Sequence, residues 1–210
     1  MNILNPDRPI LAILIGEEDI HRISTALPDI SFLQIPVSES DWNDQLSPWP
    51  AEKVFRKGSD FGGHADCFLE EQVEPVLREV QSFYQHILLA GYSLAGLFSL
   101  YASERIDGID GVMSASGSLW YPGFTEYLKQ NPSHAEFFYL SVGNTEKNSR
   151  SPILSKVEEK TRETKDILES QNRHVFYELR EGGHFSDPCP RIIRGVEKLA
   201  GMCYDNPRAL

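Results

Sequence analysis

Cysteine is scarce in this chain, and positive charge is in the minority. The three cysteines, Cys67, Cys189 and Cys203, are odd in number and show no C-x-x-C spacing, so we expect reduced thiols without a structural disulfide. Lysine and arginine number 20 against 31 aspartates and glutamates, which gives a net charge of −11. Because no basic run is present, nucleic acid and anionic membranes are not expected partners. Strongly anionic substrates are also disfavoured unless the fold builds a local basic pocket.

Long apolar runs and cofactor motifs are missing as well. No apolar stretch reaches membrane-spanning length, and none follows a basic start at the N-terminus, so the sequence predicts a cytoplasmic protein without a membrane partner. Gly62-Gly63 lacks the partners of a phosphate-binding loop. His64, Asp66 and Cys67 cluster, but no second group has ligand spacing, so we predict neither a metal nor another cofactor. The sequence gives no indication of oligomeric state.

Short apolar runs alternate with helical patterns along the chain. The 210 residues, 40% of them apolar, suit one domain over residues 1–210 without a separate lid domain. The predicted strands are residues 10–15, 31–37, 86–91, 111–115, 136–142 and 174–180, and the predicted helices are residues 66–84, 94–104, 153–170 and 191–202. Most strand candidates are apolar throughout. The sequence therefore predicts a compact α/β fold, with a mostly parallel sheet of about six strands covered by helices on both faces.

One long segment, residues 38–64, does not follow this alternation. It is rich in Ser, Asp, Pro and Gly, and it contains Trp42 and Trp49. Long excursions of this kind are uncommon in compact domains and are often functional. We expect at least one of the two tryptophans to line a binding pocket, with Trp49 favoured because prolines flank it. The alternative is a surface loop that the two tryptophans hold in place.

The most informative feature is a single serine between a strand and a helix. Residues 86–91 are an apolar strand candidate, residues 94–104 continue as a helix, and Ser93 lies at the turn between them. Gly91 and Ala95 flank it two residues away on either side, and both are small, as a close strand–helix approach requires. Such a turn exposes a serine hydroxyl and supplies backbone N–H donors, so Ser93 is a candidate nucleophile. The alternative is an ordinary connection that carries an inert serine.

A nucleophilic serine needs a base, and His184 is the best candidate. It follows the last predicted strand, residues 174–180, and Gly182-Gly183 before it permit a sharp turn that presents the imidazole. Position at the end of a late strand is typical of the histidine in a Ser–acid–His arrangement. His64, in its own glycine-rich loop, is a distant second.

An acid must orient that imidazole. Glu146 is the first carboxylate after the predicted strand at residues 136–142, and it lies between Ser93 and His184 in the chain order that the arrangement requires. Asp187 is the main alternative, because it follows His184 by three residues.

The backbone around the serine predicts the remaining parts of a site. The amide of Leu94, first in the helix, is one expected oxyanion donor, and the second is expected near Gly16-Glu17, after the first predicted strand. Tyr92, Trp120 and Trp49 are the expected lining of the substrate pocket.

Taken together, these segments resemble the α/β-hydrolase superfamily, and in particular the esterase branch that contains esterase D and the ferric-siderophore esterases. The matching segments are Gly-Tyr-Ser-Leu-Ala-Gly-Leu at 91–97, Ser-Ala-Ser-Gly-Ser-Leu-Trp at 114–120, Val-Gly-Asn-Thr-Glu at 142–146 and Gly-Gly-His at 182–184. The resemblance implies hydrolysis of small carboxylic esters through an acyl-enzyme, with Ser93 as nucleophile, His184 as base and Glu146 as acid. Relative to that branch, we expect the leading antiparallel strands to be missing.

Two further interpretations remain open at this stage. A thioesterase or an acyltransferase would use the same three residues. A catalytically degenerate hydrolase fold that serves as a binding module is the alternative outside enzymes, although the intact order of serine, glutamate and histidine argues against it.

Overall fold

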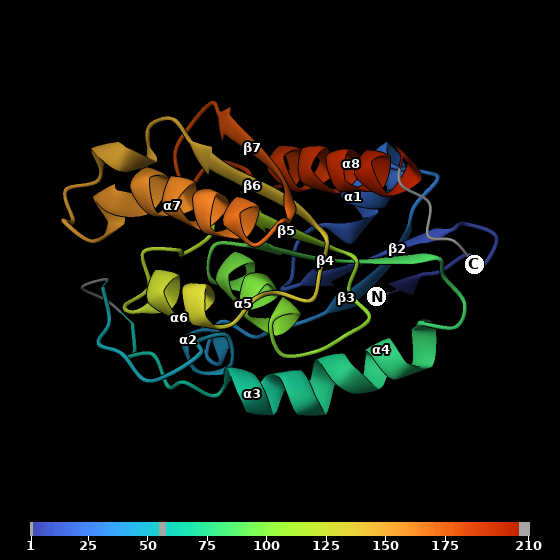
Figure 1. Cartoon of the computed structure of the whole chain (residues 1–210), viewed down its shortest axis with the longest axis horizontal. Helices are drawn as coiled ribbons and strands as arrows, with labels where there is room; N and C mark the ends of the chain where they lie inside the picture. The colour runs from blue at the N-terminus through green and yellow to red at the C-terminus, as the bar shows by residue number, and fades with distance from the viewer. Residues whose placement is uncertain (1, 55–57, 206–210) are drawn as a thin grey trace.

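A computed structural model describes residues 2–54 and 58–205, and over these ranges the chain forms a seven-stranded sheet (Figure 1). The strand order is β1-β3-β2-β4-β5-β6-β7, and every neighbouring pair is parallel except β1 and β3. The strands are β1 (Asn2–Ile3), β2 (Ile10–Ile15), β3 (Ser31–Ile35), β4 (His86–Tyr92), β5 (Gly111–Ala115), β6 (Phe137–Gly143) and β7 (His174–Arg180). The predicted parallel α/β sheet is confirmed.

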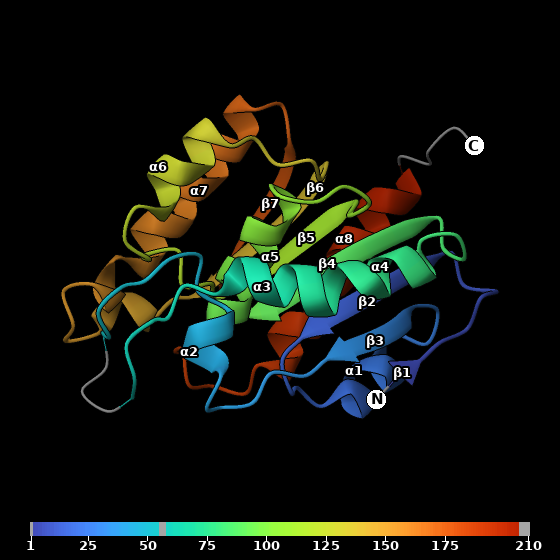
Figure 2. The same cartoon turned by 90° about the horizontal axis from the view of Figure 1, so that it is seen from below.

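Helices cover both faces of this sheet, which explains why its central strands are apolar throughout. Ile10–Ile15, for example, is buried at every position. On one face, side chains of α1 (Ile20–Ala26) and α8 (Cys189–Asp205) share a core with the strands. On the other face, a larger core includes side chains from further helices (Figure 2). These are α3 (Ala65–Phe68), α4 (Glu74–Val80), α5 (Leu94–Ser103), α6 (Phe124–Gln130) and α7 (Val157–Ser170).

Some elements differ from those expected. The antiparallel β1 is present at the sheet edge, so the expected loss of every leading antiparallel strand is wrong. The helix predicted at residues 66–84 is interrupted by a π-helical segment, Leu69–Val73, between α3 and α4. The short helices α1 and α6 were not predicted.

The long segment 38–64 is partly ordered by local structure. It contains the short helix α2 (Trp42–Gln45) and an isolated antiparallel bridge between Ala51 and Phe61. Residues 55–57 of this predicted loop lie outside the described residues. Trp49 of this segment contacts Tyr121, which lies in the connection between β5 and α6.

Within the described ranges, none of the helices combines the length and the apolar character that a bilayer-spanning segment needs. The expectations of a cytoplasmic location and of a single domain without a lid stay predictions.

Candidate active site

The turn between β4 and α5 holds Ser93 in an unusual backbone conformation. β4 ends at Tyr92 and α5 begins at Leu94, and Ser93 between them has φ 58° and ψ −122°. A non-glycine residue in the positive-φ region is strained and persists only where the surrounding structure enforces it. The enforcement comes from close packing, because a Cβ at Gly91 would lie 2.2 Å from the carbonyl oxygen of Ala95. The turn is therefore as sharp as the small flanking residues predict.

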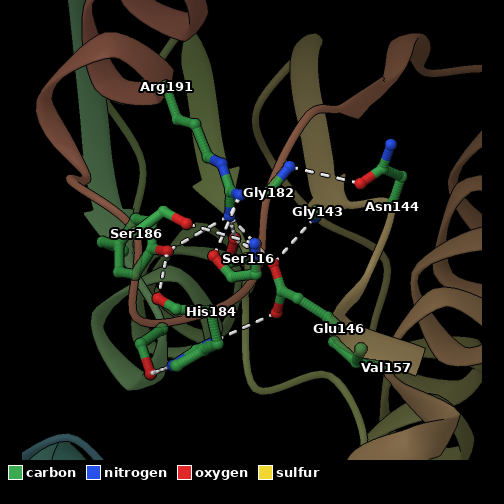
Figure 3. Close-up of polar contacts among 12 residues, drawn as sticks. Ser116, Gly143, Asn144, Glu146, Val157, Gly182, His184, Ser186 and Arg191 are labelled. Atoms are coloured by element: carbon green, nitrogen blue, oxygen red, sulfur yellow. Dashed lines mark hydrogen bonds and ion pairs between the residues drawn. The ribbon is translucent and has the colours of Figure 1, made fainter. Parts of the chain in front are cut away.

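The structure brings the three predicted side chains together. Ser93 Oγ lies 2.9 Å from Nε2 of His184, and Nδ1 of His184 lies 3.0 Å from Oε2 of Glu146 (Figure 3). The His184 side chain is 25% exposed and that of Glu146 only 3%. In this hydrogen-bonded series, the acid is therefore buried and the histidine next to the serine is accessible. A serine, an imidazole and a buried carboxylate in this order can move a proton away from the hydroxyl.

The two alternatives considered from the sequence lie elsewhere. Asp187 is half-exposed and pairs with Arg22 at 2.6 Å. His64 is exposed and its Nδ1 lies 2.8 Å from Asp44. Neither group contacts the Ser93 hydroxyl or the His184 ring among the contacts of the described residues.

Glu146 is held as a carboxylate in a buried setting. Its Oε1 accepts hydrogen bonds from the Gly143 amide and from Ser116 Oγ, both at 2.7 Å. Burial by itself raises the pKa of Glu146, but the hydrogen bonds from His184, Ser116 and Gly143 outweigh it and hold that pKa below its usual value. The acid is thus charged and fixed, as an orienting group requires.

A buried arginine, Arg191, completes this arrangement and was not predicted from the sequence. Its Nη1 donates to Glu146 Oε1 at 2.9 Å and also to Ser116 Oγ, and its Nη2 donates to the carbonyl oxygens of Glu181 and Gly183 at 3.2 and 3.1 Å (Figure 3). The side chain is only 4% exposed. One guanidinium therefore links the acid to the loop that carries His184, using the planar set of donors that only arginine offers.

Tyr92 belongs to the same support and lies outside the cavity where it was expected. Its hydroxyl donates to the carbonyl oxygen of His184 at 2.7 Å and accepts from Arg191 Nη1 at 3.2 Å. Burial raises the pKa of the Tyr92 phenol, so the hydroxyl keeps the proton that it donates. The Tyr92 hydroxyl is therefore hydrogen-bonded to the loop that carries His184.

Comparison with protein-family models finds no match. In sequence, the chain is 27% identical over 173 residues to the uncharacterized protein YbbA of Bacillus subtilis (strain 168), covering 75% of this chain and 69% of that protein. In structure, it is similar to an IroE-like serine hydrolase from Shewanella oneidensis, with a TM-score of 0.70, 16% identity and coverage of 92% of this chain and 71% of that one. The chain has the α/β-hydrolase fold.

Two further solved structures share the α/β-hydrolase fold with this chain. The enterobactin esterase FES from Shigella flexneri has a TM-score of 0.67 and 19% identity, and the match covers 97% of this chain and 55% of that one. The siderophore hydrolase EstA from Aspergillus nidulans has a TM-score of 0.61 and 17% identity, over 91% of this chain and 82% of that one. At these identities the likeness concerns the fold.

In this α/β-hydrolase fold, a cavity of about 270 Å³ opens over the serine, and we call it the reaction cavity. Trp120 is part of its lining, and Leu154, Val157 and Phe185 supply further apolar walls. Phe185 is 88% exposed and directly follows His184, so an aromatic ring stands at the entrance. Among the described residues, Glu146 and His184 are the acidic and basic side chains of the lining.

Trp49 and Trp42 lie outside this lining, which corrects the expectation for the long segment. Trp49 Nε1 donates to the carbonyl oxygen of Pro122 at 2.9 Å, and its ring packs against Tyr121 and Tyr127. The Trp49 ring therefore packs against the connection between β5 and α6, which also contains Trp120. The hydrogen bond and the ring contacts of Trp49 join the long segment to this connection, and the sequence composition did not indicate these contacts.

We expect Trp49→Ala to destabilise the protein by about 1–3 kcal/mol, because a half-buried ring and its hydrogen bond are lost. The KM for p-nitrophenyl esters should change little. Trp120→Ala, which removes a wall of the reaction cavity, should raise KM or alter the acyl-chain preference more than Trp49→Ala does. Thermal melts and steady-state kinetics of both variants check this. A larger KM change in the Trp49 variant would contradict the assignment.

Two backbone amides, near Ser93 and after β2, were predicted to be oxyanion donors. Leu94 is the first residue of α5, and first-turn amides have no acceptor within their own helix, so its N–H is available beside Ser93. In the loop after β2, the Gly16 amide donates to the carbonyl oxygen of Ile35 at 3.0 Å and is therefore engaged. Glu17 is exposed, and it lines a different cavity whose walls also include His64. Its amide as the second oxyanion donor stays a prediction.

Proposed function

We propose that this protein is a serine hydrolase that cleaves a small carboxylic ester through an acyl-enzyme. The observation that carries the proposal is the continuous hydrogen-bonded series from Ser93 Oγ through His184 to buried Glu146, at a strained strand–helix turn that opens into a cavity. Proteins of the same fold that are described as an IroE-like serine hydrolase and as an enterobactin esterase support an ester as substrate. The expected partner is a small ester, and the proposal needs no cofactor.

In the proposed reaction, Ser93 Oγ attacks the ester carbonyl carbon while Nε2 of His184 takes the hydroxyl proton. The Leu94 amide, with that of Glu17, stabilises the negative charge on the carbonyl oxygen. His184 then gives its proton to the leaving alkoxide, and the acyl group stays on Ser93. A water molecule, deprotonated by His184, then attacks the carbonyl carbon of the acyl-enzyme. The bond from that carbon to Ser93 Oγ breaks as His184 gives the proton to Oγ, which releases the acid and restores the serine.

Glu146 has two tasks in this scheme. Its Oε2 accepts from Nδ1 of His184, which leaves Nε2 free to accept the Ser93 proton and stabilises the imidazolium that forms. Its Oε1 is occupied by Ser116, Arg191 and the Gly143 amide, so the carboxylate cannot rotate away.

Fluorophosphonate labelling and a matched panel of esters and thioesters test the proposal. We expect labelling at Ser93 and turnover of p-nitrophenyl acetate. Faster turnover of thioesters, or acyl transfer to an added alcohol or amine, would indicate instead the thioesterase or acyltransferase that the same residues permit. A folded protein that neither labels nor turns over any ester would indicate a binding module.

We expect Arg191→Met to lower kcat by about 10- to 100-fold with a smaller change in KM, because the acid and the histidine loop lose their common support. The cationic partner favours the charged form of Glu146, so its loss raises the pKa of Glu146 and moves the acid limb of the kcat profile to higher pH. Arg191→Lys should restore part of the rate.

The matched control is Arg194→Met on the same helix, where Arg194 pairs with Glu178 and Glu197 near the surface. It should leave both kcat and the acid limb unchanged. An Arg191→Met enzyme with wild-type kcat and an unshifted profile would show that Arg191 serves the fold alone.

A further inference from the structure

A second cavity lies directly beside the reaction cavity. It has a volume of about 310 Å³, and its walls come from the connection before α6 and from the segment that leads into α7. These two helices lie side by side in both views (Figures 1 and 2). Trp120 lines both cavities, and residues 152–160 supply walls to both, with Leu154 and Val157 in the reaction cavity and Ile153 and Lys156 in its neighbour. We call the second one the adjoining cavity.

The two cavities differ in charge. Among the described residues that line the reaction cavity, none is a lysine or an arginine. In the part of the chain that the structure describes, the adjoining cavity is lined by Lys156 and Lys160 and by no carboxylate. In a chain of net charge −11, a cavity lining that carries two lysines is a local concentration of positive charge. This is the basic pocket that the composition alone left open.

The two lysines differ in their present partners. Lys160 Nζ lies 2.6 Å from Glu163. Lys156 is exposed and makes no ion pair within the part of the chain that the structure describes. An ammonium group without an ion-pair partner can take an anion from a ligand without first giving up an internal contact.

Apart from Thr125, the remaining walls are aromatic or apolar. Trp120 and Tyr121 lie in tilted contact, with ring centroids 6.4 Å apart, and Pro122, Pro152 and Ile153 continue the surface. Apolar walls with a few placed polar groups are typical of small-molecule sites. A ligand here would place an apolar body against the rings and an anionic group at the lysines.

We propose that the adjoining cavity binds the distal end of the substrate, and that this end carries a carboxylate or a similar single anionic group bound by Lys156 and Lys160. The inference rests on the proposed ester hydrolysis. The ester carbonyl occupies the reaction cavity, which is lined without cations, the chain of the substrate passes Trp120, and the anion pairs with the lysines. The substrate class is therefore an ester with an apolar body and one anionic end, on either its acyl or its alcohol side.

Pairs of esters that differ only in charge test this proposal. The acyl-side pair is the mono-p-nitrophenyl ester of adipic or suberic acid and its twin with the distal carboxyl capped as a primary amide. The alcohol-side pair is the butyrate ester of 4-carboxyphenol and that of 4-carbamoylphenol. For at least one pair, we expect Lys156→Glu to lower kcat/KM of the carboxylate ester by about tenfold and to leave its amide twin unchanged. This difference should shrink in molar salt.

Lys165→Glu is the matched control, because Lys165 lies on α7, undergoes the same change of charge and is absent from the lining of either cavity. It should affect the carboxylate and amide esters equally. If Lys156→Glu also changes kcat/KM equally for the carboxylate and the amide ester of both pairs, the adjoining cavity is not an anion subsite. If the wild-type protein turns over none of these esters, nor p-nitrophenyl acetate, the proposed hydrolysis itself fails, which is a separate result.

Discussion

Ser93→Ala and His184→Ala are each expected to lower kcat for p-nitrophenyl acetate by about four to six orders of magnitude. The two groups act as a unit, because the hydroxyl is a poor nucleophile unless the imidazole 2.9 Å away takes its proton. Removing either one therefore removes nearly the whole effect, and the double variant should be scarcely worse than the single ones.

Activity should be compared at equal concentrations of protein with unchanged circular dichroism, and fluorophosphonate labelling should disappear in the Ser93 variant. Ser118→Ala is a suitable control, since Ser118 lines the same cavity and should keep activity within about an order of magnitude. Turnover close to that of the wild type in either the Ser93 or the His184 variant would overturn the assignment.

Glu146→Ala should cost about 10²- to 10⁴-fold in kcat, less than the serine change, because an imidazole that has lost its acid keeps part of its orientation. The loss also leaves Arg191 buried without its anion, and breaking a buried ion pair is strongly destabilising. Glu146→Gln, which retains hydrogen-bonding oxygen and shape, separates the two effects. It should fold better than the alanine variant and still lose most of the activity.

Asp187→Ala is the comparison that decides between the two acids. Its carboxylate is half-exposed and pairs with Arg22, so we expect kinetics close to those of the wild type. A large loss in the Asp187 variant, together with a small one in Glu146→Gln, would mean that the histidine is oriented by a different group in solution.

Much of the fold could be predicted because its central strands have a strong local signature. The runs Ile10–Ile15, Gly111–Ala115 and His174–Arg180 begin and end where the sequence predicted. β1 could not be found, since two residues carry no periodicity and its pairing with β3 is decided by the sheet edge. The helix α6 was missed because it is short and begins after Gly123, a left-handed residue, instead of at a side-chain cap.

Some residues of the candidate site could likewise be predicted from local sequence, whereas others depend on tertiary packing. Ser93, His184 and Glu146 follow strand ends, and parallel strands bring those ends to one edge, so sequence order was enough to predict that they meet. Arg191 was missed because its role depends on how α8 packs over the sheet, which no local pattern records. Trp49 and Tyr92 were placed in the cavity because large aromatic rings often line pockets, but nearby backbone carbonyls, unseen in the sequence, take their polar atoms.

The buried contact between Tyr92 and Arg191 joins residues 99 positions apart, and this separation has a consequence for biosynthesis. The strand and turn that bear Ser93 leave the ribosome well before the acid, the imidazole and the guanidinium that would activate the hydroxyl. In the proposed scheme, the Ser93 hydroxyl of a nascent chain therefore has the ordinary reactivity of a serine until those groups are in place. Under the proposed function, full reactivity requires that α8 packs over the sheet, so the rate of ester hydrolysis would report how completely a population of chains has folded.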